Sequence, residues 1–270
     1  MLIVGYIASL IIGISLGLIG GGGSILTVPV LVYLMGVDPV MATAYSLFIV
    51  GATSLAGVIP KYKAGEVNIK TATIFGIPAI AAVFLTRKFI VPAIPEEIFT
   101  IGDFVLTKGI LLMVLFAILM VFASVSMITS KKDSGPESGE QKFNYPLIFL
   151  EGIIVGILTG LVGAGGGFLI IPALVILSKL PMKQAVGTSL LIIAAKSLIG
   201  FTGDLGNAPI DWKLILTVTA LAIVGIILGS MLSNKVDGKK LKKGFGWFVL
   251  VMGIYILIKE LLFHSPSTGH

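Results

Sequence analysis

The 270-residue chain contains no cysteine and only two histidines. The lack of cysteine excludes disulfide bonds, thiol catalysis and cysteine-ligated metal sites. The two histidines, His264 and His270, lie close to the C-terminus and do not have the spacing of zinc ligands. We therefore expect neither a metal site nor a cofactor.

Charged residues are equally scarce, because they make up 12% of the chain, whereas 56% of its residues are apolar. Soluble domains contain about a quarter charged residues, so this chain has too few for a water-facing surface. It offers one apolar run after another, many of them near the roughly 20 residues that a membrane-spanning helix needs. The short alternating strands of an outer-membrane barrel do not occur. The composition predicts an all-α polytopic membrane protein.

Several functional motifs are also missing from the sequence. There is no GxxxxGK[ST] phosphate loop, and no glycine motif follows a strand in a soluble βαβ unit. The net charge is +6, but the basic residues lie between the apolar runs rather than in one patch with aromatic residues. The predicted spans hold no paired acids and no nucleophile with a base. We expect neither nucleic-acid binding nor enzymatic activity.

An internal duplication is the strongest pattern that is present. When the chain is shifted by 143 residues, Gly13 to Lys70 aligns with the second half without a gap, and Gly17 falls on Gly160. Glycine, proline and serine positions coincide along this alignment, which apolar composition alone would not produce. The segment between the halves contains Gly, Pro, Ser and charged residues, as is typical of a linker. We predict one transporter domain made of a first repeat (1–130), a polar linker (131–145), a second repeat (146–264) and a tail (265–270).

Each repeat begins with an apolar segment that a run of glycines interrupts, Gly20–Gly23 in the first repeat and Gly163–Gly167 in the second. The first segment, Leu2–Gly36, would be roughly 50 Å long as one straight helix, which is too long for an upright span. It either crosses the membrane as a broken helix or forms a re-entrant hairpin. The remaining predicted spans are Pro39–Ile59, Ile69–Thr86, Val105–Ile128, Met182–Thr202, Trp212–Ser233 and Gly244–Phe263.

The distribution of basic residues favours the hairpins. If each repeat has a hairpin and three spans, one side of the membrane collects thirteen lysines, including those of the linker, and the other side keeps five basic residues, Arg87, Lys88, Lys108, Lys213 and Lys259. This asymmetry places the linker in the cytoplasm by the positive-inside rule. An odd number of crossings makes the repeats inverted, as in many secondary transporters. The irregular, acidic stretch Val91–Phe104 then faces outward.

The two glycine runs, which we call the glycine breaks, are the predicted binding site. Glycines at a helix break leave backbone N–H groups exposed at the start of the next helix, where the helix dipole also favours an anion. Close helix packing is the alternative explanation of such glycines. The glycine-break residues of the predicted site are Gly20, Gly21, Gly22, Gly23, Ser24, Gly163, Gly165, Gly166 and Gly167.

Polar residues within the spans complete the predicted site. Lys196 lies well inside a predicted span, where an ionisable side chain is costly and usually faces a cavity or a partner, unless it reaches the interface. Hydroxyl groups near Lys196, together with the serine of the first repeat that corresponds to Ser189, could donate to an oxyanion or bond neighbouring helices. These residues are Thr188, Ser189, Ser197 and Ser46. Glu151, Asp204 and Asp211 are either proton-relay groups or ordinary interfacial charges.

Four blocks of the sequence resemble the TauE/SafE family of sulfite and organosulfonate exporters of the bacterial inner membrane. They read GLIGGGGSILTVP (Gly17–Pro29), ATAYSL (Ala42–Leu47), GLVGAGGGFLIIP (Gly160–Pro172) and AVGTSL (Ala185–Leu190). The resemblance implies a multi-pass membrane transporter for a small sulfur-containing oxyanion, such as sulfite or an organosulfonate, that works by alternating access. An anion channel and a transporter of another small anion are the alternatives. No ATP-binding motif is present, so transport would be passive or driven by an ion gradient, with protons as the candidate coupling ion.

Overall fold

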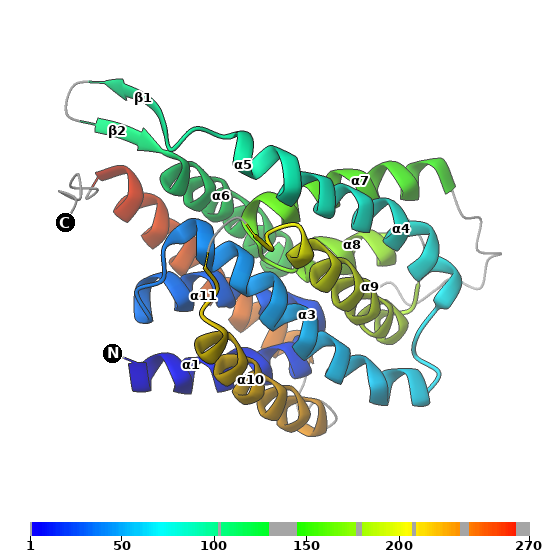
Figure 1. Ribbon diagram of the computed structural model, residues 1–270. Coiled ribbons are helices and arrows are strands. Elements are labelled where there is room, and N and C mark those ends of the chain that lie inside the picture. The colour runs from blue at the N-terminus through cyan, green and yellow to red at the C-terminus, as the bar shows by residue number, and fades with distance from the viewer. Residues whose placement is uncertain are drawn as a thin grey trace.

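The computed structural model describes residues 2–101, 104–129, 145–176, 180–206, 209–232 and 238–262. The predicted tail and all but Tyr145 of the predicted linker lie outside these ranges. In the described residues the chain is almost entirely helical (Figure 1). The helices are α1 (Leu2–Ile19), α2 (Thr27–Pro29), α3 (Pro39–Lys63), α4 (Ile69–Leu85), α5 (Val91–Ala93), α6 (Lys108–Thr129), α7 (Tyr145–Val162), α8 (Gly167–Ile176), α9 (Met182–Thr202), α10 (Trp212–Leu232) and α11 (Gly238–Leu262).

Seven helical segments among the described residues are long and apolar enough to cross a membrane. The all-α polytopic membrane fold is therefore confirmed. The predicted spans agree with the helices to within a few residues at most ends, because the apolar runs that partition into lipid are also the runs that form helix. Helix starts follow local rules as well: α3 begins with Pro39, and Asp38 Oδ1 accepts hydrogen bonds from Val40 N at 2.9 Å and Met41 N at 3.1 Å.

The described residues of Val91–Phe104 are more regular than the sequence predicted. They include α5, the strand β1 (Glu97–Ile101) and the first residue of β2 (Phe104–Thr107), and the two strands pair antiparallel with Thr100 opposite Val105. The prediction of an irregular stretch was wrong for the strands. Two strands of five and four residues give too short an alternation to stand out beside the long apolar runs.

The first glycine-broken segment turns back on itself. After α1 the chain continues as a 3₁₀ helix, η1 (Gly20–Leu26), then α2, then a π-helical turn, η2 (Val30–Leu34). A Cβ atom placed on Gly5 would lie 2.7 Å from Met35 Cγ and Cε, so the start of the segment lies beside its end. The chain direction therefore reverses at the glycine break, as a hairpin requires.

Contacts between the two halves occur in pairs that share the 143-residue offset of the duplication. α1 packs against α10, and α7 packs against α4 (Figure 1). At these contacts Gly13 meets Ala222, and the equivalent Gly156 meets Ala79. Such reciprocal contacts are those of an approximate two-fold rotation between the halves.

Two hydrogen bonds between the halves are also related by the 143-residue offset. Asp211 N donates to Tyr45 Oη, and Asn68 N donates to Thr188 Oγ1, both at 2.9 Å. Each bond joins the start of one helix to a helix of the other repeat. The inversion of the repeats across a bilayer stays a prediction.

This topology predicts the side on which introduced cysteines react, and the absence of natural cysteine makes the experiment clean. In intact cells, we expect a membrane-impermeant thiol reagent to label Thr100→Cys on the exposed hairpin and to leave Ser134→Cys in the linker unlabelled until the cells are permeabilised. The cysteine-free parent protein is the control. Labelling of Ser134→Cys in intact cells would contradict the cytoplasmic linker.

Candidate functional site

The two glycine breaks meet in the interior of the protein. A Cβ atom on Gly21 would lie 2.6 Å from Gly167 Cα, and one on Gly167 would overlap the backbone of Gly21. Ser24 Oγ connects the breaks, since it lies 2.6 Å from the carbonyl oxygen of Ala164 and 2.7 Å from that of Gly21. The Gly21–Gly167 and Ala164–Ser24 contacts are themselves a pair at the 143-residue offset. The backbones can approach this closely only because the contact positions lack bulky side chains.

The other glycines of the breaks have different neighbours. Gly20 and Gly163 have φ angles of +74° and +70°, which favour glycine, and they contact Val186 and Thr43 of the opposite repeat. Gly23 contacts Ser15 and Leu16 of its own hairpin, Gly165 lies beside Ser24, and Gly166 lies beside Thr159 and Lys196. Gly22 differs from the rest, because a Cβ there would meet only Ile19 Cγ2, at 3.2 Å.

The second break also contains the start of a helix, at the point where the two breaks meet. α8 begins at Gly167, so the N–H groups of Gly167 and Phe168 stand where the intrahelical carbonyl partners are missing. The hydrogen bonds of this turn begin with Leu169 N and Ile170 N, each 2.9 Å from Gly166 O. The positive end of the α8 dipole therefore points at the meeting of the two breaks.

Lys196 on α9 brings a positive charge to the same place. Its side chain is fully buried, and Nζ lies 2.7 Å from Thr159 Oγ1 and 3.3 Å from the position of a Cβ on Gly166. Among the described residues no carboxylate lies within ion-pair distance of it. A buried ammonium group held only by a hydroxyl favours an anionic partner.

The predicted hydroxyl groups are all buried, but their surroundings differ. Ser46 Oγ and Ser197 Oγ have no hydrogen-bond partner within the described part of the chain, so both can still donate. Ser189 Oγ donates to Val186 O of its own helix at 2.8 Å, and Thr188 Oγ1 accepts from Asn68 N. The Ser189 hydroxyl thus uses its hydrogen within its own helix, whereas the Thr188 hydroxyl still has a hydrogen to donate.

A cavity of about 500 Å³ lies next to Arg87. It is lined by the start of α3, the segment Arg87–Pro92, the residues that flank the β-hairpin and the end of α9. Its charged lining residues are Asp38, Arg87, Glu96, Lys108 and Asp204. Lys108 Nζ lies 3.5 Å from Glu96 Oε1, and the Glu96 side chain is 83% exposed.

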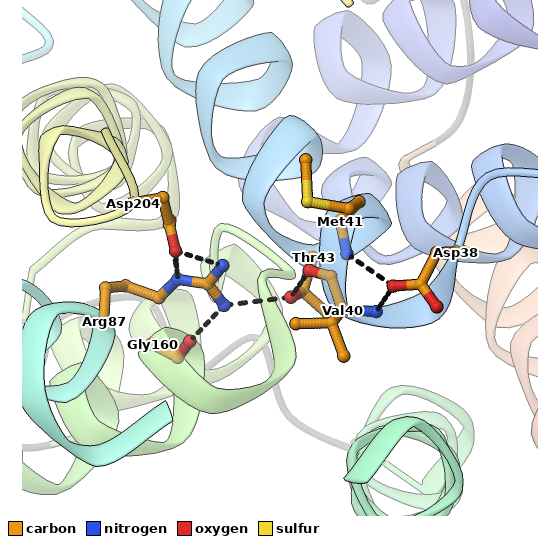
Figure 2. Close-up of polar contacts among 7 residues, drawn as sticks. All are labelled: Asp38, Val40, Met41, Thr43, Arg87, Gly160 and Asp204. Carbon is orange, nitrogen blue, oxygen red and sulfur yellow. Dashed lines mark hydrogen bonds and ion pairs between the residues drawn. The ribbon is translucent and has the colours of Figure 1, made fainter. Parts of the chain in front are cut away.

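Arg87 lines the cavity and also reaches toward the second break. Figure 2 shows its contacts with Asp204, Thr43 and Gly160. Its guanidinium group holds Asp204 with Nε 2.7 Å from Oδ2 and Nη2 2.7 Å from Oδ1. Nη1 donates to Thr43 Oγ1 at 2.9 Å and to Gly160 O at 3.2 Å. Gly160 belongs to the last turn of α7 before the break, and Thr43 contacts Gly163 within it. Burial raises the pKa of the Asp204 carboxyl, and the charge and hydrogen bonds of Arg87 oppose that rise.

Arg87, Lys108 and Thr159 were not among the predicted site residues. The predicted span ended at Thr86 and left Arg87 in a loop, whereas the helix continues through a π-helical turn, η3 (Thr86–Ile90). The apolar residues Phe89, Ile90 and Val91 after the charges were a signal that the helix goes on. Thr159 carried no such signal, because its role depends on Lys196, 37 residues away.

Comparison with known proteins identifies the chain. A family model described as sulfite exporter TauE/SafE matches residues 5–256, nearly the whole sequence. The chain belongs to the TauE/SafE family. The glycine breaks, Arg87 and Lys196 all lie within the matched region. No solved structure gives a significant match to this TauE/SafE protein.

Curated relatives agree with the family assignment. A "Probable membrane transporter protein" of Xylella fastidiosa (strain 9a5c) is 30% identical over 253 residues, which cover 92% of this chain and 91% of the relative. The "Probable membrane transporter protein YunE" of Bacillus subtilis (strain 168) is 27% identical over 267 residues, covering 93% of each chain. The family description and these names indicate a membrane transporter rather than an enzyme.

Proposed function

We propose that this TauE/SafE protein is a secondary transporter of a small sulfur-containing oxyanion, sulfite or an organosulfonate, across the inner membrane. The observation that carries the proposal is the meeting of the two glycine breaks beside Lys196. This region offers the two N–H groups at the start of α8 and a buried ammonium group without a carboxylate partner. A small anion would satisfy all three donors at once.

The reciprocal contacts between the halves support alternating access. Ser24 bonds to Ala164, and Gly21 contacts Gly167, so the contact between the breaks joins the two repeats rather than lying within one. Rocking of one repeat against the other would open this contact from one side and then the other. A proton gradient is the proposed energy source, because the chain carries no ATP-binding motif.

Reconstitution in liposomes tests the proposal. We expect uptake of labelled sulfite that saturates with concentration and that sulfoacetate or thiosulfate inhibits, in liposomes with protein but not in empty ones. An imposed proton gradient is expected to increase the initial rate. Flux that stays proportional to sulfite concentration would indicate a channel. Folded protein that moves none of these sulfur anions would remove sulfur oxyanions as the substrate class.

A further inference from the structure

The ion pair between Arg87 and Asp204 joins the two repeats at the boundary between the cavity and the second glycine break. Arg87 and its hydrogen-bond partner Thr43 belong to the first repeat, whereas Asp204 and Gly160 belong to the second. The Arg87 side chain is 1% exposed and the Asp204 side chain 13%, so both charges are largely removed from water. A movement of one repeat against the other must break some of these bonds.

The repeat architecture does not require this pair. At the 143-residue offset, Arg87 corresponds to Ser230 and Asp204 corresponds to Lys61. Gly17, the equivalent of Gly160, packs directly against the backbone of Ser230. Lys61 instead pairs with Glu66 of its own repeat at 2.8 Å, and both side chains are more than a fifth exposed. Among the described residues, the equivalent corner of the fold thus has no buried ion pair between the repeats. The duplicated architecture therefore does not explain the ion pair at Arg87.

The charges around the cavity single out Asp204 among its acids. Asp38 caps the start of α3 with its carboxylate, and Glu96 is mostly exposed beside Lys108. Among these acids, the Asp204 carboxylate lies across the fork of the guanidinium group, with Nε 2.7 Å from Oδ2 and Nη2 2.7 Å from Oδ1. This is the geometry in which an arginine binds an oxyanion through two parallel hydrogen bonds.

We infer that Arg87 is a second oxyanion-binding residue of the transport path, and that Asp204 occupies its guanidinium as an internal competitor when no anion is bound there. The inference rests on the proposed function and adds an outer binding step to it. An oxyanion entering the cavity displaces the Asp204 carboxylate from Arg87 and takes its place. Arg87 then holds the anion next to Gly160, one helical turn before the glycine break.

Three substitutions test this inference through the concentration dependence of sulfite flux in liposomes. Asp204→Asn removes the competing charge but keeps a hydrogen-bond acceptor, so we expect the KM for sulfite to fall by about tenfold, the scale of one charge-assisted hydrogen bond. Asp204→Glu keeps the competing carboxylate and is expected to leave the KM within about threefold of the parent. Arg87→Lys keeps the charge but loses the fork, so the KM is expected to rise by about tenfold or more. Lys88→Gln, an exposed neighbour, is the matched control for surface charge at this end of the protein.

The outcomes separate this inference from the proposed function. A purely structural ion pair would lower the amount of folded protein or the maximal rate in Asp204→Asn and Arg87→Lys and leave the KM unchanged, which would overturn the inference alone. If Asp204→Asn does not fold, the KM of Arg87→Lys decides. Saturable sulfite flux in the parent with unchanged KM in folded variants leaves the inner site at the glycine breaks standing. No sulfite flux in folded parent protein would overturn the proposed function, and this inference with it.

Discussion

Replacing Lys196 by methionine is expected to abolish saturable sulfite flux while the protein remains folded. Methionine preserves the length and apolar stem of the side chain but removes the buried charge, whose nearest polar partner is Thr159 Oγ1. Loss of the buried partner of a charge costs about 3 kcal/mol or more, which corresponds to a loss of at least about a hundredfold in transport efficiency. Initial rates across a range of sulfite concentrations measure it.

The same substitution is expected to leave thermal stability unchanged or raised. A buried ammonium group without a carboxylate partner destabilises the folded protein, and an apolar side chain of similar size removes that cost. Unfolding temperature in detergent is the measurement. Lys213→Met, at the exposed start of α10, is the matched control and should transport as the parent does. Folded Lys196→Met protein with full sulfite flux would show that the anion does not bind Lys196.

Replacing Gly167 by alanine is expected to prevent the two glycine breaks from packing. The added Cβ would overlap Cα, C and O of Gly21, all of them backbone atoms that no side-chain rotation can move away. We expect a loss of about 3 kcal/mol or more in stability, at the upper end of overpacking effects, because the second contact between the breaks, Ser24 to Ala164, is strained at the same time. The yield of monodisperse protein and its unfolding temperature measure the effect.

Gly22→Ala is the matched control for this prediction, since it also adds one methyl group within a glycine break. Its Cβ would meet only Ile19 Cγ2 at 3.2 Å, and a side-chain methyl can shift by a few tenths of an ångström. We expect a stability change of within about 1 kcal/mol. If Gly167→Ala and Gly22→Ala were equally stable, the close contact between Gly21 and Gly167 could not be essential to the fold.

Helix positions and the relation between the halves were predictable without coordinates, because both depend on local or repeated features. The apolar run of Met182–Thr202 predicted α9 to the residue, since a lipid-spanning segment must satisfy its backbone polar groups within its own helix. The offset that aligns Gly17 with Gly160 also relates the observed contacts between repeats, such as Gly13 with Ala222 and Gly156 with Ala79. Duplicated sequences bury equivalent faces, and two equivalent halves pack through equivalent contacts.

The partners of the polar side chains could be decided only by the tertiary structure. Arg87 bonds to groups 44, 73 and 117 residues away, and nothing in the sequence around it specifies those distances. The four consecutive glycines look alike in the sequence. Yet a Cβ on Gly21 would contact the backbone of Gly167, whereas a Cβ on Gly22 would contact only a methyl group of Ile19. Hydropathy reports how a segment partitions into lipid, whereas a buried charge or a missing Cβ acts through the atoms that folding brings against it.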